Sequence, residues 1–295
     1  MRIGIIGGGA IGLLFGAYLS KNHHVTIYTR SNEQSKEIME KGLVLKKGTT
    51  QEICRVHAVP FPNDDVKRDD LVIVAVKQYH LPEIISYLQS LSCNLLFIQN
   101  GMGHLQYCEV LSASSEVFVG IVEHGALKEG QAELVHTGDG IVKIASYNGD
   151  IQRIQVLQNE AFPISFEDDY YEMLQKKLMV NAMINPLTAV LRVTNGELIH
   201  NTYYHQLFQR LFEELVPILQ IENQNELYCH VESICRNTAK NRSSMLRDIE
   251  ENRPTEIDSI LGYILQKAEQ KQMQAPLTNN LYLMVKGEEC NEREV

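Results

Sequence analysis

A lysine and two asparagines stand four residues apart in QKKLMVNAMINPLTA, residues 175–189. On a helix, Lys177, Asn181 and Asn185 would lie within roughly 80° of one another, whereas Lys176 would lie on a different side. An ammonium group can stabilise negative charge on an oxygen and give up a proton, and an amide can fix the direction of a carbonyl group. Polar groups in an otherwise apolar segment are costly when buried without partners, so this row either faces water or lines a site.

A second polar row occurs in NRSSMLRD, where Asn241, Ser244 and Asp248 would share one face of a helix. Glu256 follows it, beyond a proline. These residues also suit ordinary structure, because a helix dipole favours a carboxylate in the first turn and Asp248 could pair with a surface cation. The spacing leaves a binding role and a structural role open.

Two polar residues end predicted strands in the first half of the chain. Lys77 closes LVIVAVK, residues 71–77, and Asn100 follows NLLFIQ, residues 94–99. Continuously apolar strands of this kind are typical of a parallel sheet that is covered on both faces. Because the carboxyl ends of such strands border the crevice where α/β domains bind ligands, we expect Lys77 and Asn100 to lie at a binding site.

The segment GGGAIG, residues 7–12, matches the G-x-G-x-x-G pattern of dinucleotide-binding loops. It lies between a predicted strand at 2–6 and a predicted helix at 10–20, and a second strand is predicted at 24–29. Glycines allow a tight turn there and let a pyrophosphate reach the unpaired N–H groups of the helix start. The expected cofactor contacts from this loop are Gly7, Gly9, Ala10, Ile11 and Gly12.

A ligand-free turn and a secretory leader both fit this opening less well. A tight turn between buried elements would need no ligand, but the strand, loop and helix context fits the dinucleotide pattern. A secretory leader is disfavoured, because the glycines make a poor apolar helix and no small-x-small cleavage site follows.

The end of the predicted second strand indicates which dinucleotide is bound. NAD-binding proteins usually place Asp or Glu there, but this chain has Thr29, Arg30 and Ser31. A carboxylate would repel a 2′-phosphate, whereas a guanidinium group can bind one through two hydrogen bonds. The sequence therefore favours NADP, with Arg30 on the 2′-phosphate, over the alternative that Arg30 is a solvated surface charge.

The first part of the chain alternates predicted strands and helices. This pattern predicts an α/β class, with a Rossmann-like, doubly wound NADP-binding domain over residues 1–167. Hairpin-like strands with Gly-rich turns at 117–146 are expected to close its sheet.

The rest of the chain, residues 168–295, is predicted to form an all-helical substrate and catalytic domain. Apolar residues recur at helical spacing in 203–220 and 255–270, which indicates core-facing stripes. In the second stripe Thr255 is the expected N-cap, with Asp258 three residues on. We expect ligands to bind in a cleft between the two domains.

Composition limits the class of protein. With 295 residues, 44% of them hydrophobic, the chain can form two domains with cores. Apolar runs beyond the opening fall far short of the roughly 20 residues that a membrane-spanning helix needs. The formal net charge of −10 argues against nucleic acid or an acidic membrane as a partner, so a small molecule is expected.

The cysteines indicate a reducing compartment. No CxxC pair occurs, and no histidine is placed to complete a zinc ligand set, so we expect free thiols, a cytoplasmic location and no metal site. The six cysteines are Cys54, Cys93, Cys108, Cys229, Cys235 and Cys290.

A set of motifs occurs in order over nearly the whole chain: GGGAIG, VAVK, QNGMG, KLMVNAMINPLTA, NGEL, SSMLRDI and PTEID. Together they resemble the motifs of the ketopantoate reductases (2-dehydropantoate 2-reductases). The resemblance implies a Rossmann-like domain followed by a helical domain like the C-terminal domain of 6-phosphogluconate dehydrogenase. It also implies an NADP-dependent oxidoreductase that reduces the 2-oxo group of ketopantoate to give pantoate, in the biosynthesis of pantothenate, a coenzyme A precursor.

The resemblance also implies roles for individual residues. Lys177 becomes the catalytic lysine and Glu256 its acidic counterpart, while Lys77 falls near the nicotinamide ribose and Arg30 on the 2′-phosphate. Asn100 is expected to contact the cofactor as well as the substrate. The expected substrate-binding residues are Asn100, Asn181, Asn185, Asn195, Asn241 and Ser244. The chain departs from the family at His80, where a Gln near the cofactor is common.

Several questions stay open at this point. The chain could reduce another 2-oxo acid, because groups that bind a carboxylate and a carbonyl do not specify the rest of the substrate. It could also be an inactive NADP-binding sensor, although intact Lys177 and Glu256 argue against this. The helical half could bury a homodimer interface or only its own core, and His124 and His136 receive no role.

Overall fold

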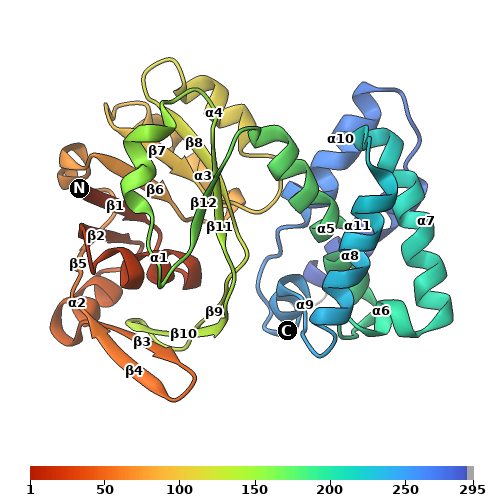
Figure 1. The fold of residues 1–295 in the computed structure, drawn as a ribbon, viewed down its shortest axis with the longest axis horizontal. Helices are drawn as coiled ribbons and strands as arrows, with labels where there is room; N and C mark the ends of the chain where they lie inside the picture. The colour runs from red at the N-terminus through yellow and green to blue at the C-terminus, as the bar shows by residue number, and fades with distance from the viewer. Residues whose placement is uncertain (291–295) are drawn as a thin grey trace. The chain divides into compact units, whose positions relative to one another are not determined.

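The computed structural model describes residues 1–290, which form two compact units (Figure 1). The first unit comprises Met1–Gln99 and His104–Met173, and the second comprises Asn100–Gly103 and the chain from Leu174 onward. The two units divide within helix α5 (Tyr170–Leu191), which begins just after the domain boundary that we predict at 167/168.

An eight-stranded sheet forms the centre of the first unit, in the order β12-β11-β8-β7-β6-β1-β2-β5. Neighbouring strands in it are parallel, except that β8 and β11 are antiparallel. The strand order reverses beside β1, so the carboxyl ends of β1 and β6 border the switch point where doubly wound folds bind ligands. In chain order the strands are β1 (Arg2–Ile6), β2 (His24–Thr29), β5 (His57–Pro60), β6 (Leu71–Val74), β7 (Asn94–Phe97), β8 (Val117–Val122), β11 (Val142–Ser146) and β12 (Ile164–Glu167).

The sheet's central strands are buried, as their sequence predicts. Every residue of β6 is buried, as are the four that follow Arg2 in β1. The apolar side chains on both faces are shielded from water by the helices that connect the strands. These helices are α1 (Ala10–Leu19), α2 (Asn32–Lys41), α3 (Leu81–Leu88) and α4 (Leu105–Leu111).

Strands β6 and β7 end earlier than the apolar runs that predict them. Gln99 accounts for part of the difference, because its Nε2 donates hydrogen bonds to the main-chain oxygens of Val74, at 2.8 Å, and Val76, at 3.1 Å. The amide of Gln99 therefore binds main-chain oxygens at the ends of these strands, and that of Val74 also accepts from the N–H of Ile98 at 3.4 Å.

A smaller sheet in the same unit corrects part of the prediction for residues 117–146. Strands β8 and β11 do join the main sheet. The two strands between them, β9 and β10, instead combine with β3 and β4 in a separate four-stranded sheet, in the order β4-β3-β10-β9. Leu134 pairs with Leu45 there, and both side chains pack into the core against α1. This pairing covers an edge that the β3–β4 hairpin would otherwise expose. The four strands are β3 (Leu43–Lys47), β4 (Thr50–Cys54), β9 (Gly125–Lys128) and β10 (Glu133–Gly138).

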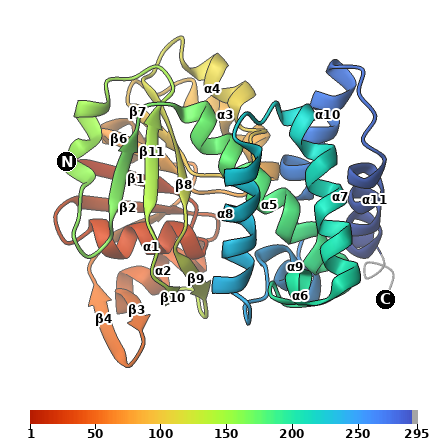
Figure 2. The same ribbon diagram turned by 45° about the vertical axis from the view of Figure 1, so that its right-hand side comes forward.

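The second unit is helical, which confirms the predicted fold class (Figure 2). Beside α5 it contains α6 (Glu197–His200), α7 (Thr202–Leu219), α8 (Gln224–Asn237), α9 (Ser244–Glu250), α10 (Tyr263–Gln270) and α11 (Pro276–Cys290). The predicted stripe of α7 is buried at Leu211, Leu215 and Ile218. Within residues 1–290 no helix has the length and apolar character to cross a membrane.

The helix predicted at 255–270 begins differently from our expectation. A π-helical segment, Asp258–Gly262, precedes α10, and the N-cap position falls at Ile257, so the prediction of Thr255 as the N-cap is wrong. The hydroxyl oxygen of Thr255 still accepts a hydrogen bond from the N–H of Ile257 at 3.2 Å, and the hydroxyl donates to Glu289 at 2.7 Å. The predicted core residues Ile257, Ile260, Leu261 and Ile264 are buried, and Leu265 is half-buried.

Candidate active site

The loop between β1 and α1 bends sharply at its glycines. Gly7 has φ +118°, a conformation that L side chains rarely adopt, and a Cβ atom on it would lie 2.9 Å from the main chain of Ala75. A Cβ atom on Gly12 would collide with the carbonyl oxygen of Gly7. Glycine at both positions therefore lets β1, the loop and α1 approach one another closely.

The start of α1 has the features that an anionic ligand needs. The N-cap residue is Gly9, which has no side chain to accept a hydrogen bond from the first turn of the helix. The first turn also contains no acidic residue. A Cβ atom on Gly9 would meet no atom within 4 Å, so a ligand can approach the main chain there. The N–H groups of Ala10 and Ile11 have no partner inside the helix, and the helix dipole favours negative charge beside them. These residues fit the pyrophosphate of a dinucleotide.

Gln34 on α2 holds this loop in place, and the sequence patterns above do not single it out. Its Nε2 donates hydrogen bonds to the main-chain oxygens of Gly8, at 2.8 Å, and Gln131, at 2.9 Å. Gln34 follows Ser31, the N-cap of α2, at the spacing of a capping box. That spacing would have been the only available signal, and it predicts a side chain that returns to Ser31 rather than one that reaches the glycine loop.

Arg30 is exposed at the end of β2, where the sequence predicts it. Its Nη1 lies 3.4 Å from Nε2 of His80, and Nδ1 of His80 lies 3.6 Å from a carboxylate oxygen of Glu83. A guanidinium group can only donate, so Nε2 of His80 is the acceptor of this bond, while Nδ1, the other ring nitrogen, faces Glu83. No carboxylate pairs with Arg30 among residues 1–290, which leaves its charge available to an anion.

Lys77 lies in the turn that carries His80. It is half-buried after the end of β6, and its main-chain oxygen accepts a hydrogen bond from the N–H of His80 at 2.9 Å. The first unit thus connects two residues predicted to bind the cofactor, Lys77 and Arg30, through His80.

Asn100 and Glu256 meet in the second unit. Nδ2 of Asn100 donates a hydrogen bond to Oε2 of Glu256 at 2.9 Å, and Glu256 is 9% exposed. Gly101 has φ +78°, and a Cβ atom on it would collide with the carbonyl oxygen of Ser259. The loop after β7 therefore packs directly against the segment that carries Glu256, which brings together two residues predicted from separate motifs.

The polar row on α5 is mostly buried. Asn181 and Asn185 are each 8% exposed and Lys177 is half-buried, whereas Lys176 is exposed. Nδ2 of Asn181 is buried and has no hydrogen-bond partner among residues 1–290. Leaving such a donor unpaired costs about 1–3 kcal/mol, so this burial favours a ligand site over a water-facing row.

A main-chain hydrogen bond joins Asn195 to Asn241. The N–H of Asn195 donates a hydrogen bond to the main-chain oxygen of Asn241 at 3.0 Å, and Nδ2 of Asn195 donates to Oγ1 of Thr238 at 2.9 Å. Oδ1 of Asn195 is buried and has no partner among residues 1–290. In the side chain of Asn195, Oδ1 can therefore still accept a hydrogen bond, whereas Nδ2 already donates one to Thr238.

The row expected at Asn241, Ser244 and Asp248 does not form on one helix face. Asn241 precedes α9, because the helix is capped by Ser243, whose Oγ accepts hydrogen bonds from the N–H of Leu246 and the hydroxyl of Thr188. Asn241 and Ser244 are exposed.

Asp248 has a structural partner. It is buried, and its Oδ1 accepts a hydrogen bond from Nε of Arg253 at 2.9 Å. This contact matches the structural alternative for Asp248, a pair with a basic residue.

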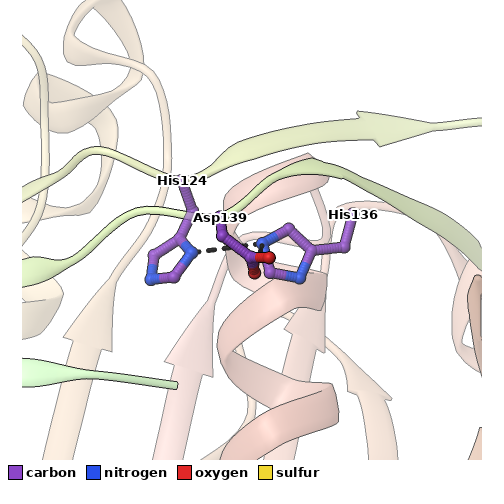
Figure 3. A group of neighbouring side chains, drawn as sticks. All are labelled: His124, His136 and Asp139. Atoms are coloured by element: carbon purple, nitrogen blue, oxygen red, sulfur yellow. Dashed lines mark hydrogen bonds and ion pairs between the residues drawn. The ribbon is translucent and has the colours of Figure 1, made fainter. Parts of the chain in front are cut away.

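Two histidines to which the sequence assigns no role form a buried chain of hydrogen bonds (Figure 3). Nδ1 of His124 accepts from the N–H of Gly140 at 3.1 Å, so Nε2 of His136, also at 3.1 Å, must be the donor of the bond between the two rings. Nδ1 of His136 then accepts from the hydroxyl of Tyr18 on α1 at 2.7 Å.

The carboxylate of Asp139 belongs to the same cluster. Hydrogen bonds and an ion pair explain the arrangement of these three side chains better than a bound metal ion does. Asp139 forms an ion pair with Lys47 at 2.6 Å and lies 3.8 Å from Nε2 of His136. Burial lowers the pKa of both histidines, that of His124 to about 4, so both rings are neutral at neutral pH. The lone pair of each ring already accepts a hydrogen bond, as described above.

Comparisons with known proteins identify the family. The model described as ketopantoate reductase PanE/ApbA matches residues 3–149, and its C-terminal counterpart matches residues 169–289. The 2-dehydropantoate 2-reductase of Bacillus subtilis (strain 168) is 40% identical over 300 aligned residues, with 100% of each chain covered. The enzyme of the same name from Listeria innocua is 39% identical and covers 100% of this chain and 99% of its own.

Solved structures give the same result. A probable 2-dehydropantoate 2-reductase, PanE, from Bacillus subtilis superposes with a TM-score of 0.90 at 39% identity, covering 98% of this chain and 100% of its own. D-mandelate dehydrogenase in complex with NADH and anilino(oxo)acetate has a TM-score of 0.88 at 25% identity, with 98% of each chain covered. Since relatives at this identity match its full length, the chain belongs to the ketopantoate reductase (PanE/ApbA) family.

Proposed function

We propose that this chain reduces the 2-oxo group of 2-dehydropantoate (ketopantoate) to give pantoate, with NADPH as the reductant. The proposal is carried by one observation: the buried carboxylate of Glu256 is hydrogen-bonded to Asn100, in a chain 40% identical over its full length to a 2-dehydropantoate 2-reductase. Glu256 and Lys177 supply the charged groups that this reaction needs.

NADP is preferred to NAD in this proposal because of the end of β2. Gly7, Gly9, Ala10, Ile11 and Gly12 would hold the pyrophosphate, and Arg30 would bind the 2′-phosphate. The related D-mandelate dehydrogenase holds NADH on a similar fold, so the fold alone does not select the cofactor. The preference for NADP comes from a basic residue, Arg30, where NAD-binding proteins usually have a carboxylate.

The side chains of the second unit act on the substrate. When bound, the nicotinamide supplies the hydride. Nζ of Lys177 then stabilises the negative charge that develops on the oxygen of the 2-oxo group and gives it a proton, so that a hydroxyl group forms. Glu256, hydrogen-bonded to Asn100, orients the substrate hydroxyl or the lysine.

The remaining polar residues position the substrate. Asn181 and Asn185 set the angle of the 2-oxo group, and Asn181 has a buried donor to use. Asn195 offers its free acceptor, Oδ1. Asn241 and Ser244, both exposed, donate hydrogen bonds to the substrate carboxylate. Lys77 lies near the nicotinamide ribose in this arrangement.

The variant Lys177→Ala tests the proposed acid. Loss of a general acid typically costs roughly 10²- to 10⁴-fold in turnover, and the Kd for NADPH should stay unchanged because the glycine loop is intact. Lys176→Ala is the matched control, since Lys176 is exposed on another side of α5. NADPH oxidation followed by absorbance gives kcat, and nearly normal turnover of Lys177→Ala would remove the lysine from the mechanism.

A second candidate is the reduction of a different 2-oxo acid. It is favoured by the likeness to D-mandelate dehydrogenase, whose structure holds anilino(oxo)acetate, an amide analogue of a 2-oxo acid. A panel of 2-oxo acids separates the two, because kcat/KM should be highest for ketopantoate. Absence of turnover with every member would instead favour the inactive NADP-binding sensor.

The cytoplasm is the proposed location. All six cysteines are free, and burial raises the pKa of Cys54 to about 11 and of Cys108 and Cys235 to about 12, which keeps these thiols protonated. Unpaired thiols of this kind suit a reducing compartment. A homodimer stays a prediction, to be checked by the molar mass in solution.

A further inference from the structure

The segment that carries Glu256 is held by a carboxylate from the last described helix. Oε1 of Glu289 on α11 accepts two hydrogen bonds from Thr255, one from the main-chain N–H and one from the hydroxyl, both at 2.7 Å. Thr255 is 3% exposed, and the side chain of Glu289 is 8% exposed. Thr255 immediately precedes Glu256, so this buried contact acts on the residue next to the proposed site.

The main chain of Glu256 is also fixed on its other side. Its oxygen accepts hydrogen bonds from the hydroxyl of Ser259 at 2.9 Å and from the N–H of Ser259 at 3.1 Å. The hydroxyl oxygen of Thr255 accepts a further bond from the N–H of Ile257 at 3.2 Å. The turn that carries Glu256 is therefore held at both ends, and its carboxylate accepts the hydrogen bond from Asn100.

A row of polar residues on α11 also holds the segment that follows Glu256. Lys286 lies between Glu289, at 2.9 Å, and Asp258, at 3.1 Å, and Asp258 also accepts a hydrogen bond from the hydroxyl of Tyr282 at 2.7 Å. Tyr282, Lys286 and Glu289 are spaced i, i+4 and i+7, so they occupy one face of the helix. Lys286 is the ion-pair partner of Glu289, while Oε1 of Glu289 accepts both bonds from Thr255.

We propose that Glu289 is a positioning residue for the reaction, acting through Thr255 to aim the carboxylate of Glu256 at Asn100 and the substrate. The inference rests on the proposed function, in which Glu256 acts on a bound 2-oxo acid. Glu289 need not touch the substrate, because a small displacement of an aligned group is enough to slow a reaction. The π-helical turn after Glu256 is the kind of local irregularity that often accompanies functional sites.

A double-mutant cycle between Glu289 and Glu256 separates positioning from general stability. Glu289→Ala should lower kcat/KM for ketopantoate by roughly tenfold or more, with the Kd for NADPH unchanged. In an enzyme that already carries Glu256→Gln, the same substitution should have almost no effect on kcat/KM, because the group that it positions has been removed. A purely structural role would lower kcat/KM by the same factor in both backgrounds.

Conservative variants protect the test against loss of folding. Glu289→Gln keeps an oxygen acceptor and should retain part of the activity. Thr255→Ser keeps the hydroxyl and should have the kcat/KM of the wild type, whereas Thr255→Val should lower kcat/KM as Glu289→Ala does. Glu288→Gln is the matched control, since Glu288 pairs with Arg192 on the surface. Thermal unfolding of each variant shows whether it is folded at the assay temperature.

The outcomes are distinct. Wild-type enzyme without ketopantoate turnover, or normal turnover in Glu256→Gln, would overturn the proposed function and this inference with it. An active wild type in which Glu289→Ala and Glu256→Gln act independently would overturn the inference alone. Loss of activity in folded Glu289→Ala that disappears in the Glu256→Gln background would support it.

Discussion

Replacing Arg30 by glutamate should change the cofactor preference of the enzyme. Arg30 is exposed at the end of β2 and pairs with no carboxylate among residues 1–290, so its guanidinium group can form charge-assisted hydrogen bonds with a 2′-phosphate. Such a contact contributes about 1.5–3 kcal/mol. That energy corresponds to an affinity difference of roughly tenfold to 150-fold. Arg30→Glu also adds repulsion, so the Kd for NADPH should rise at least about tenfold.

The assay compares two cofactors that differ only in the 2′-phosphate. Fluorescence titration of NADPH and NADH should show a weaker NADPH complex and a nearly unchanged NADH complex for Arg30→Glu. Arg55→Glu is the matched control, because it makes the same change in net charge at another exposed position of the first unit. If both cofactors lose affinity equally, or if NADPH affinity is unchanged, the assignment of Arg30 to the 2′-phosphate is refuted.

Two further predictions concern stability and the glycine loop. Burial lowers the pKa of His104 from 6.5 to about 4, so on acidification the unfolded chain takes up a proton at this residue before the folded chain does. The contribution of neutral His104 to the free energy of unfolding should therefore be fully present above about pH 6.5. It should fall by up to about 3 kcal/mol as the pH decreases toward 4. Thermal unfolding across this range should show a smaller loss for His104→Leu, and an identical pH dependence would contradict the reasoning. Gln34→Ala removes the hydrogen bond to Gly8, which contributes about 0.5–1.5 kcal/mol, and should therefore weaken NADPH binding roughly twofold to thirteenfold. Gln51→Ala, at an exposed position, should not change the Kd for NADPH. Equal Kd values for these two variants would show that the loop does not depend on Gln34.

Features set by short-range spacing were predictable from the sequence. The strand, glycine loop and helix around Gly7 and Gly12 follow a local pattern, and the structure gives the geometric reason for both glycines. Lys177, Asn181 and Asn185 lie on α5 at the predicted spacing, because a long helix keeps its phase. The burial of these asparagines was not predictable, since it depends on what packs around the helix.

Features set by distant contacts were not predictable in this way. The bond between Asn100 and Glu256 joins residues 156 positions apart, and no local pattern encodes it. The row at Asn241 failed because the start of α9 depends on Ser243, whose capping hydroxyl is itself bound by Thr188 on α5. Strands β9 and β10 joined the smaller sheet because β3, far away in the sequence, offered an edge.

The most direct test of the central claim is the rate of NADPH oxidation by the purified chain with ketopantoate as substrate. We expect steady turnover that yields pantoate, a higher kcat/KM for ketopantoate than for other 2-oxo acids, and a loss of at least roughly a hundredfold in the turnover of Lys177→Ala. A chain that binds NADPH but oxidises none of it with ketopantoate, or a Lys177→Ala variant as fast as the wild type, would contradict it.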